Sequence, residues 1–156
     1  EDGSPATYKD EGAITFMGWG VAHPVMTNQF GWENGAMVTL AEIEDGVYQF
    51  SGRAVEETNG TTLGGAWRYD YLSFKFFGQA GWGAEWGTVT LTDEAKKWLE
   101  VYGNVELIGK DRKADDSGWE TRYPLELGAT YVMTVTDCTP LDGDSKFNCT
   151  IDFRKL

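Results

Sequence analysis

Apolar and polar residues alternate along much of this chain, which is the pattern of a β-strand with one buried face. The clearest examples are VYQFSGRA at 47–54 and WRYDYLSFKFF at 67–77, the second of which predicts one long strand. Shorter runs of the same kind predict further strands at 13–20, 104–109, 121–128, 130–138 and 147–153. Turn signals such as Asp45-Gly46 separate them. About seven short strands divided by turns predict an all-β sandwich of two sheets.

One segment has the spacing of a helix instead. In LTDEAKKWLEVYG, Thr92 is a suitable N-cap, acidic residues follow in the first turn, and Gly103 comes after the end. The apolar residues Ala95, Trp98, Leu99 and Tyr102 recur at i, i+3, i+4 and i+7. We therefore expect one short helix over 92–102, inserted in the sandwich and packed through these side chains.

The chain length of 156 residues fits one domain with a hydrophobic core of its own. Residues 1–12, EDGSPATYKDEG, are polar and acidic, and we expect them to form a flexible leader. The sandwich domain is then predicted to occupy 13–156. No run of apolar residues is long enough to span a membrane as a helix.

The formal net charge of −12 narrows the classes of partner. Binding of a nucleic acid needs a basic surface, so a nucleic-acid partner is not expected. Strongly anionic ligands and anionic membrane surfaces are disfavoured for the same reason. A neutral, hydroxyl-rich ligand is compatible with this charge.

Large aromatic side chains stand in glycine-rich connections, where they are candidates for ligand contacts. In FKFFGQAGWGAEWGT, Trp82 and Trp86 are four residues apart among glycines, and Trp32 stands in similar company in FGWENG. The face of an indole ring suits the apolar C–H face of a sugar. Plugging one end of the core is the alternative role for these rings.

The predicted strand 67–77 adds a second group of candidates. Its alternation directs Leu72, Phe74 and Phe76 to the core, and Trp67, Tyr69 and Lys75 to the opposite face together with Tyr71, Ser73 and Phe77. This aromatic stripe with its lysine is either a ligand platform or a face covered by another part of the chain.

Signals for catalysis, metals and cofactors are weak. His23 stands alone, so neither a zinc site nor a catalytic triad is expected, and no cofactor is predicted. Glu33 and Glu85 lie beside tryptophans and leave a small β-sandwich glycoside hydrolase as an alternative. A structural or protein-interaction module using the same aromatic patch is the other alternative.

Both cysteines, Cys138 and Cys149, flank the turn of the last predicted hairpin. Placing them opposite each other is compatible with a disulfide, as in an exported protein. The same register sets the apolar residues Met133 and Val135 opposite the polar residues Arg154 and Asp152, so a β-bulge would be required. The sequence leaves the disulfide open.

Several short motifs together resemble the domains of starch-utilisation-type outer-membrane lipoproteins (SusE/SusF-like) and related surface glycan-binding modules. The motifs are GWENGAMVTLAEIEDGVYQFSG, LSFKFFGQAGWGAEWG and LELGATYVMTVTD. The matching positions are Trp32, Asp45 to Tyr48, Phe74 to Phe76, Trp82, Trp86-Gly87 and Gly128 to Asp137.

This resemblance implies an immunoglobulin-like β-sandwich that binds neutral oligosaccharide or polysaccharide without catalysis. Carried over to this sequence, the glycan contacts would be Trp32, Lys75, Trp82 and Trp86. The resemblance further implies an exported protein at the outer membrane and cell surface. Its membrane attachment would be through an N-terminal lipid anchor that this chain does not contain, and its partners would include outer-membrane transporter components.

Overall fold

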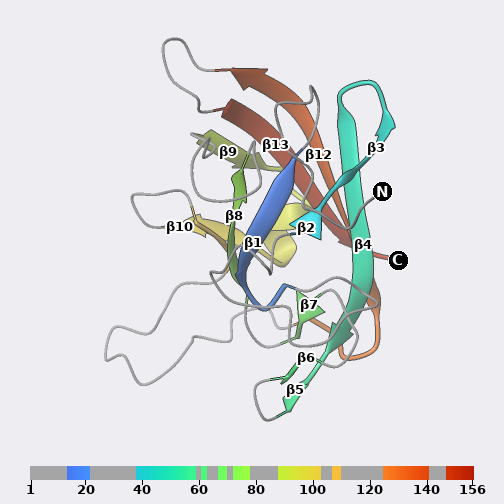
Figure 1. The fold of residues 1–156 in the computed structure, drawn as a ribbon. Helices are drawn as coiled ribbons and strands as arrows, with labels where there is room; N and C mark the ends of the chain where they lie inside the picture. Colours follow the sequence, from blue (N-terminus) through green and yellow to red (C-terminus); the bar gives the residue numbers. More distant parts are fainter. Residues whose placement is uncertain are drawn as a thin grey trace, which may run out of the picture.

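The computed structural model describes residues 14–21, 38–58, 61–62, 67–69, 72–77, 88–102, 107–109, 125–140 and 147–156. The expected leader at 1–12 lies outside them. Within these ranges the chain is almost entirely β-structure, and two sheets pack against each other (Figure 1). The all-β sandwich predicted from the alternation of apolar and polar residues is therefore confirmed.

The first sheet has five strands in the order β10-β11-β8-β1-β2, with antiparallel pairing throughout. Its strands are β10 (Glu100–Tyr102), β11 (Leu107–Gly109), β8 (Ser73–Phe77), β1 (Thr15–Trp19) and β2 (Val38–Thr39). Figure 1 shows β1 and β8 lying in front of the long strands of the other sheet. The first sheet is thus one complete layer of the sandwich.

Two glycines let the strands beside β8 approach its backbone closely. A Cβ added to Gly18 would lie 2.0 Å from the carbonyl oxygen of Ser73, and one added to Gly109 would lie 1.9 Å from that of Leu72. Both glycines also have positive φ, at +151° and +137°, a conformation that other residues rarely adopt. Glycine is therefore required at both positions, which flank the start of β8.

The second sheet contains the long strands and follows the order β3-β4-β12-β13-β9. These are β3 (Ala41–Glu44), β4 (Val47–Val55), β12 (Thr130–Pro140), β13 (Phe147–Lys155) and β9 (Thr88–Leu91). Strand β7 (Trp67–Arg68) pairs in parallel with β4, and β9 pairs in parallel with β13. A small hairpin of β5 (Glu57–Thr58) and β6 (Thr61–Thr62) lies apart from both sheets.

The predicted long strand over 67–77 is wrong, because the chain changes sheets within it. Trp67 and Arg68 pair with β4 in the second sheet, whereas Ser73–Phe77 pairs with β1 and β11 in the first. A continuous alternation thus belongs to two separate strands. The break lets Trp67 enter the core instead of continuing an outward-facing stripe.

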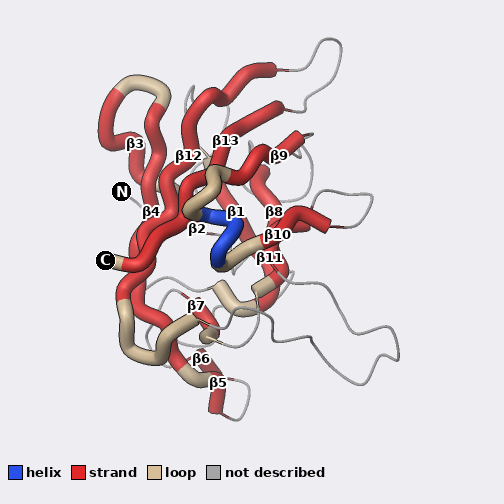
Figure 2. The backbone as a smooth tube through the Cα atoms, turned by 180° about the vertical axis from the view of Figure 1, so that it is seen from behind, coloured by secondary structure: helices blue, strands red, loops and turns tan. Residues whose placement is uncertain are grey.

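The predicted helix over 92–102 is also too long. The helical part is the 3₁₀ turn η2 (Ala95–Lys97), and the chain is already in strand β10 by Glu100. Figure 2 shows this turn between β9 and β10. The predicted strand at 121–128 is not formed over its described part, since 125–128 is coil and turn. The strands expected at 13–20, 47–54, 130–138 and 147–153 are confirmed.

The core between the sheets is built around Trp67. Its indole centroid lies 4.9 Å from the ring of Phe153, 5.6 Å from Phe50 and 6.0 Å from Phe16. Its Nε1–H donates a hydrogen bond of 3.2 Å to the carbonyl oxygen of Tyr131. Because the polar atom has a partner, the whole indole is buried without an unsatisfied donor.

Candidate functional site

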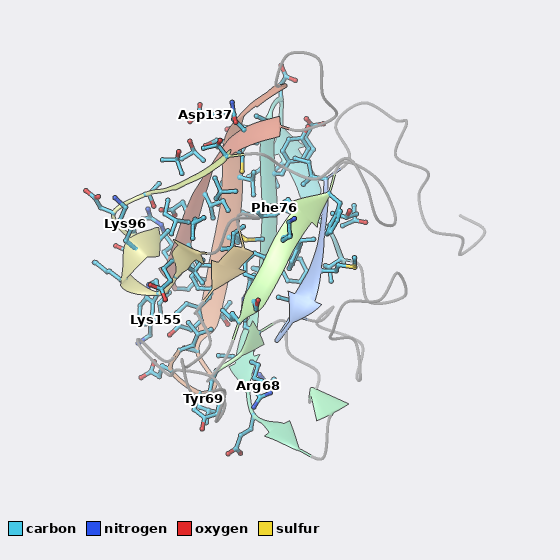
Figure 3. All side chains as sticks on the ribbon, turned by 90° about the vertical axis from the view of Figure 1, so that its left-hand side faces the viewer. Arg68, Tyr69, Phe76, Lys96, Asp137 and Lys155 are labelled. Atoms are coloured by element: carbon cyan, nitrogen blue, oxygen red, sulfur yellow. The ribbon has the colours of Figure 1, made fainter. Side chains whose placement is uncertain are left out.

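The predicted aromatic stripe does not form an exposed surface. Trp67 is fully buried in the core, and Tyr69 is half-buried and packs against it. Figure 3 shows Arg68 and Tyr69 near one end of the molecule and Asp137 near the opposite end, with Lys96 on the flank. The prediction that Trp67 faces a ligand is therefore wrong, because the sheet change turns it inward.

Lys75 occupies the centre of β8, opposite Met17 of β1. Its neighbours Phe74 and Phe76 belong to the core, so alternation directs Lys75 to the other face of the first sheet. That face is also buried, since Lys75 has 7% and Phe77 0% of its surface exposed. Lys75 thus forms part of a covered layer and is not displayed for a ligand in this structure.

The three tryptophans predicted to contact a glycan, Trp32, Trp82 and Trp86, lie outside the described residues. Glu33 and Glu85, the carboxylates of the hydrolase alternative, lie outside them as well. The structure therefore does not bring any of these candidates together with Tyr69 or Lys75 into one described site.

The described part of the chain does contain a pocket, on the flank where β9 and β10, one edge strand of each sheet, lie next to each other. It has a volume of about 380 Å³ and is formed by Val89 and Leu91 of β9, Lys96 of η2, and Leu99, Glu100 and Val101 at the start of β10. Strand β9 is the last strand of the second sheet and β10 is the last strand of the first. The pocket therefore sits at the seam of the sandwich.

Thr92 fixes the segment that forms one wall of this pocket. Its Oγ1 accepts a hydrogen bond of 3.1 Å from the amide of Ala95 and donates one of 2.6 Å to Oδ1 of Asp152. Its own amide donates to the carbonyl oxygen of Ile151 at 3.0 Å. Thr92 thus gives the amide of Ala95 the side-chain acceptor expected of an N-cap, although the residue directly before the shortened turn is Glu94, and Thr92 also attaches that turn to β13.

The chemistry of the lining is mixed. Val89, Leu91, Leu99 and Val101 offer an apolar floor, while Lys96 and Glu100 supply one cation and one carboxylate. Lys96 forms a long ion pair of 3.8 Å with Asp93, and both side chains are well exposed, so this pair holds the ammonium group only weakly. Such a pocket suits a ligand with an apolar face and hydrogen-bonding groups at its rim.

Trp98, which precedes the pocket residue Leu99, packs against the core. Its ring packs edge-on against Tyr131 with centroids 5.0 Å apart. Its Nε1 atom is buried and has no hydrogen-bond partner. The prediction that Trp98 has a packing role is consistent with this geometry, although the helix that suggested it is absent.

In the same sheet as β9, Cys138 of β12 and Cys149 of β13 face the core, and Cys149 pairs with Val89 of β9. Cys149 is buried in the core cluster and Cys138 is half-buried against it. Burial raises the pKa of the Cys138 thiol to about 11, helped by the nearby charge of Asp137. Both cysteines are free thiols in this structure, so the disulfide that the sequence left open is not formed in it.

Among the described residues, no group of three or more His, Cys, Asp or Glu side chains is placed to hold a metal ion. Within that same part of the chain, no helix is long and apolar enough to cross a membrane.

Comparison with protein families gives one match. Residues 9–139 match the family described as a domain of unknown function, DUF5121. The chain belongs to this family. No curated protein and no solved structure matches the chain. The features of this DUF5121 domain that bear on its function are the described sandwich and the pocket at its seam.

The pocket was missed at the sequence level because its residues were assigned to a helix and to a connection. Two signals could have revealed it. The run TVTL at 88–91 alternates and follows a glycine, which is a strand signal. The run LEVY at 99–102 also alternates and contains a β-branched residue, which favours a strand over the last turn of a helix.

Proposed function

We propose that this DUF5121 protein is a non-catalytic module that binds a neutral oligosaccharide or polysaccharide. The observation that carries the proposal is the position of the seam pocket relative to the tryptophan-rich segment. The pocket begins at Val89, and Trp86 precedes Val89 by three residues. A chain of three residues spans at most about 11 Å. The closeness of Trp86 to Val89 in the sequence supports a site that combines its indole ring with the pocket.

The chemistry of a sugar matches the two parts of such a site. An indole ring at the mouth would bury the C–H face of a pyranose, while the apolar floor would receive a second face or a substituent. Lys96 and Glu100 would hydrogen-bond the hydroxyl rim, Lys96 as donor and Glu100 as acceptor. A neutral ligand would pay no electrostatic penalty for approaching a chain of net charge −12.

The cellular setting forms part of the same proposal and rests on the resemblance to SusE/SusF-like domains. Such a module would be exported and held at the outer membrane through a lipid anchor. There it would capture glycan for uptake beside outer-membrane transporter components. The seam pocket replaces Trp67, Tyr69 and Lys75 in the proposed binding surface, because those three side chains are buried or half-buried.

The test combines affinity electrophoresis with calorimetry on a panel of neutral plant and starch-type polysaccharides. For a polysaccharide that retards the wild type, Trp86→Ala and Trp82→Ala should weaken binding by about tenfold to a hundredfold, equivalent to about 1–3 kcal/mol. Glu100→Gln should weaken it less, because an amide oxygen still accepts a hydrogen bond. Trp119→Ala, which removes a tryptophan from the run DDSGWET 33 residues after Trp86 in the sequence, is the matched control.

Four outcomes would contradict the proposal. The wild type could bind none of the polysaccharides, or both tryptophan variants could bind as tightly as the wild type. An early melting transition in both variants would instead assign the rings to the core, where such truncations cost about 3–5 kcal/mol of stability. Release of reducing sugar by the wild type, abolished in Glu33→Gln or Glu85→Gln, would favour the hydrolase alternative.

A further inference from the structure

The pairing of β12 with β13 brings Cys138 and Cys149 together. The register runs regularly from Tyr131 opposite Lys155 to Thr136 opposite Thr150, and it resumes with Thr139 opposite Asn148. Between these points two residues of β12, Asp137 and Cys138, oppose the single residue Cys149 of β13. This is a β-bulge, the irregularity that the apolar pattern of the hairpin required.

The bulge also decides which side chain faces inward. On β12 the inward residues are Tyr131, Met133 and Val135, so a regular strand would direct Asp137 to the core next. Asp137 instead adopts a positive φ of 55° and is exposed. The extra residue moves Cys138 onto the inward face, where Cys149 already lies. The bulge therefore exchanges a buried carboxylate for a second buried thiol.

We propose that Cys138 and Cys149 are a redox-active dithiol that an external disulfide converts to a disulfide across the bulge. The thiolate of Cys138 attacks the external disulfide, forms a mixed disulfide and releases one thiol. The thiolate of Cys149 then attacks the sulfur of Cys138 and releases the second thiol. Two electrons and two protons pass from the pair to the oxidant, which is glutathione disulfide or the disulfide of a thiol oxidoreductase.

The geometry of neighbouring strands suits this bond. Residues directly opposite each other have Cβ atoms about 4.5–5.5 Å apart, and a disulfide joins Cβ atoms about 3.5–4.5 Å apart. A slight approach of β12 to β13 closes this difference. The bulge is a place where such an approach is easy, because the regular ladder of hydrogen bonds is already interrupted there.

The surroundings assign the order of the two steps. Cys138 is half-buried and Cys149 only 3% exposed, so an external disulfide reaches Cys138 first. The groups acting on the pair are Asp137 on the same strand and Tyr48 from β4, whose hydroxyl group hydrogen-bonds Glu42. Burial raises the pKa of Cys149 further than that of Cys138. Since the thiolate is the attacking species, Cys138 reacts first by both criteria.

The experiment treats the folded, reduced chain with glutathione disulfide and follows it by alkylation and intact mass. We expect the wild type to lose two hydrogens and both alkylation sites. The rate should rise about tenfold per pH unit up to the pKa of Cys138, about 11. The oxidised form should melt about 5–10 °C higher than the reduced form, because the bond closes a loop and so lowers the conformational entropy of the unfolded chain.

Single variants show the order of attack. Cys149→Ala should stop at the mixed disulfide on Cys138, and Cys138→Ser should remain reduced because Cys149 is shielded. A reverse result, with the mixed disulfide on Cys149, would overturn the assigned order. Refolding from urea with glutathione disulfide bypasses the burial of both thiols. Two alkylatable cysteines after both the native and the refolding treatment would overturn the proposal.

Discussion

The two sheets of this sandwich share one core but differ on their outer faces. In the second sheet, buried and accessible residues alternate along β12 from Thr130 to Thr136 and along β13 from Asn148 to Arg154, so one face is packed and the other meets solvent. In the first sheet every residue of β8 is buried, on both faces. The second sheet is therefore an outer layer, whereas the centre of the first sheet is an inner one.

The side chains on the outer faces of the two sheets make different kinds of interaction. On the second sheet, Gln49 donates a 3.1 Å hydrogen bond to Thr134, and Arg154 pairs with Asp152 at 2.6 Å. On the first sheet, Met17 and Phe77 have no exposed surface. Hydrophobic burial gives far more stability than exposed polar pairs do. The outer face of the first sheet should therefore matter more to stability than that of the second.

The largest expected effect tests this difference directly. Phe77→Ala removes a fully buried ring from the outer face of the first sheet, and we expect a loss of about 3–5 kcal/mol of unfolding free energy. Arg53→Ala, on the exposed outer face of the second sheet, should change it by less than about 0.5 kcal/mol. Urea denaturation of both variants measures the two values. Equal small losses would contradict the inner-layer position of β8.

A second, smaller effect concerns the pH dependence of the polar face. The hydrogen bond from Arg154, together with one from Thr92, lowers the pKa of Asp152 below its ordinary value of 3.8. The folded state thus favours the carboxylate more than the unfolded state does. This contribution is present above pH 3.8 and is lost as the pH falls through the lower folded value.

Asp152→Asn removes this pH-dependent contribution. The variant should be less stable than the wild type at pH 7, and the difference should shrink as the pH is lowered below about 4. Urea midpoints at several pH values measure it, and Glu126→Gln, which affects the exposed pair with Lys155, is the matched control. A difference that stays constant from pH 7 to pH 3 would contradict this account.

The same contrast explains how much of the fold the sequence predicts. A strand with one solvent-exposed face can be identified from the alternation of apolar and polar residues in the sequence. This is why β4, β12 and β13 were located correctly. In WRYDYLSFKFF the alternation is equally regular, but it continues across a change of sheet. Alternation tells which residues share a face of a strand. It does not tell which sheet the strand joins, or what covers that face.

The candidate site was less predictable for a related reason. The sequence predicted a packing role for Leu99. The helical spacing of the apolar residues, however, placed Leu99 in a helix, whereas in the structure it directly precedes β10. The pocket forms because β9 and β10 lie at adjacent sheet edges. That arrangement depends on the tertiary structure and is not visible in the local sequence pattern. The bulge at Asp137 was predictable, because apolar residues on both strands could share a face only if one residue was added.

The smallest expected effect is at this bulge, where the second sheet departs from regularity. Asp137 adopts φ 55°, a conformation that costs an L-residue energy and glycine almost none. Asp137→Gly should therefore stabilise the protein slightly, by up to about 0.5 kcal/mol, since the entropy lost by glycine on folding offsets part of the relief.

Asp137→Ala is the matched control, because alanine has a Cβ but lacks the side-chain oxygen that helps aspartate tolerate this conformation. It should lower stability by about 1 kcal/mol. The two variants remove the same charge, so their difference in urea midpoint isolates the backbone term from electrostatics. If alanine were as stable as glycine, the bulge would not require a left-handed residue. The placement of Cys138 on the core face would then need another cause.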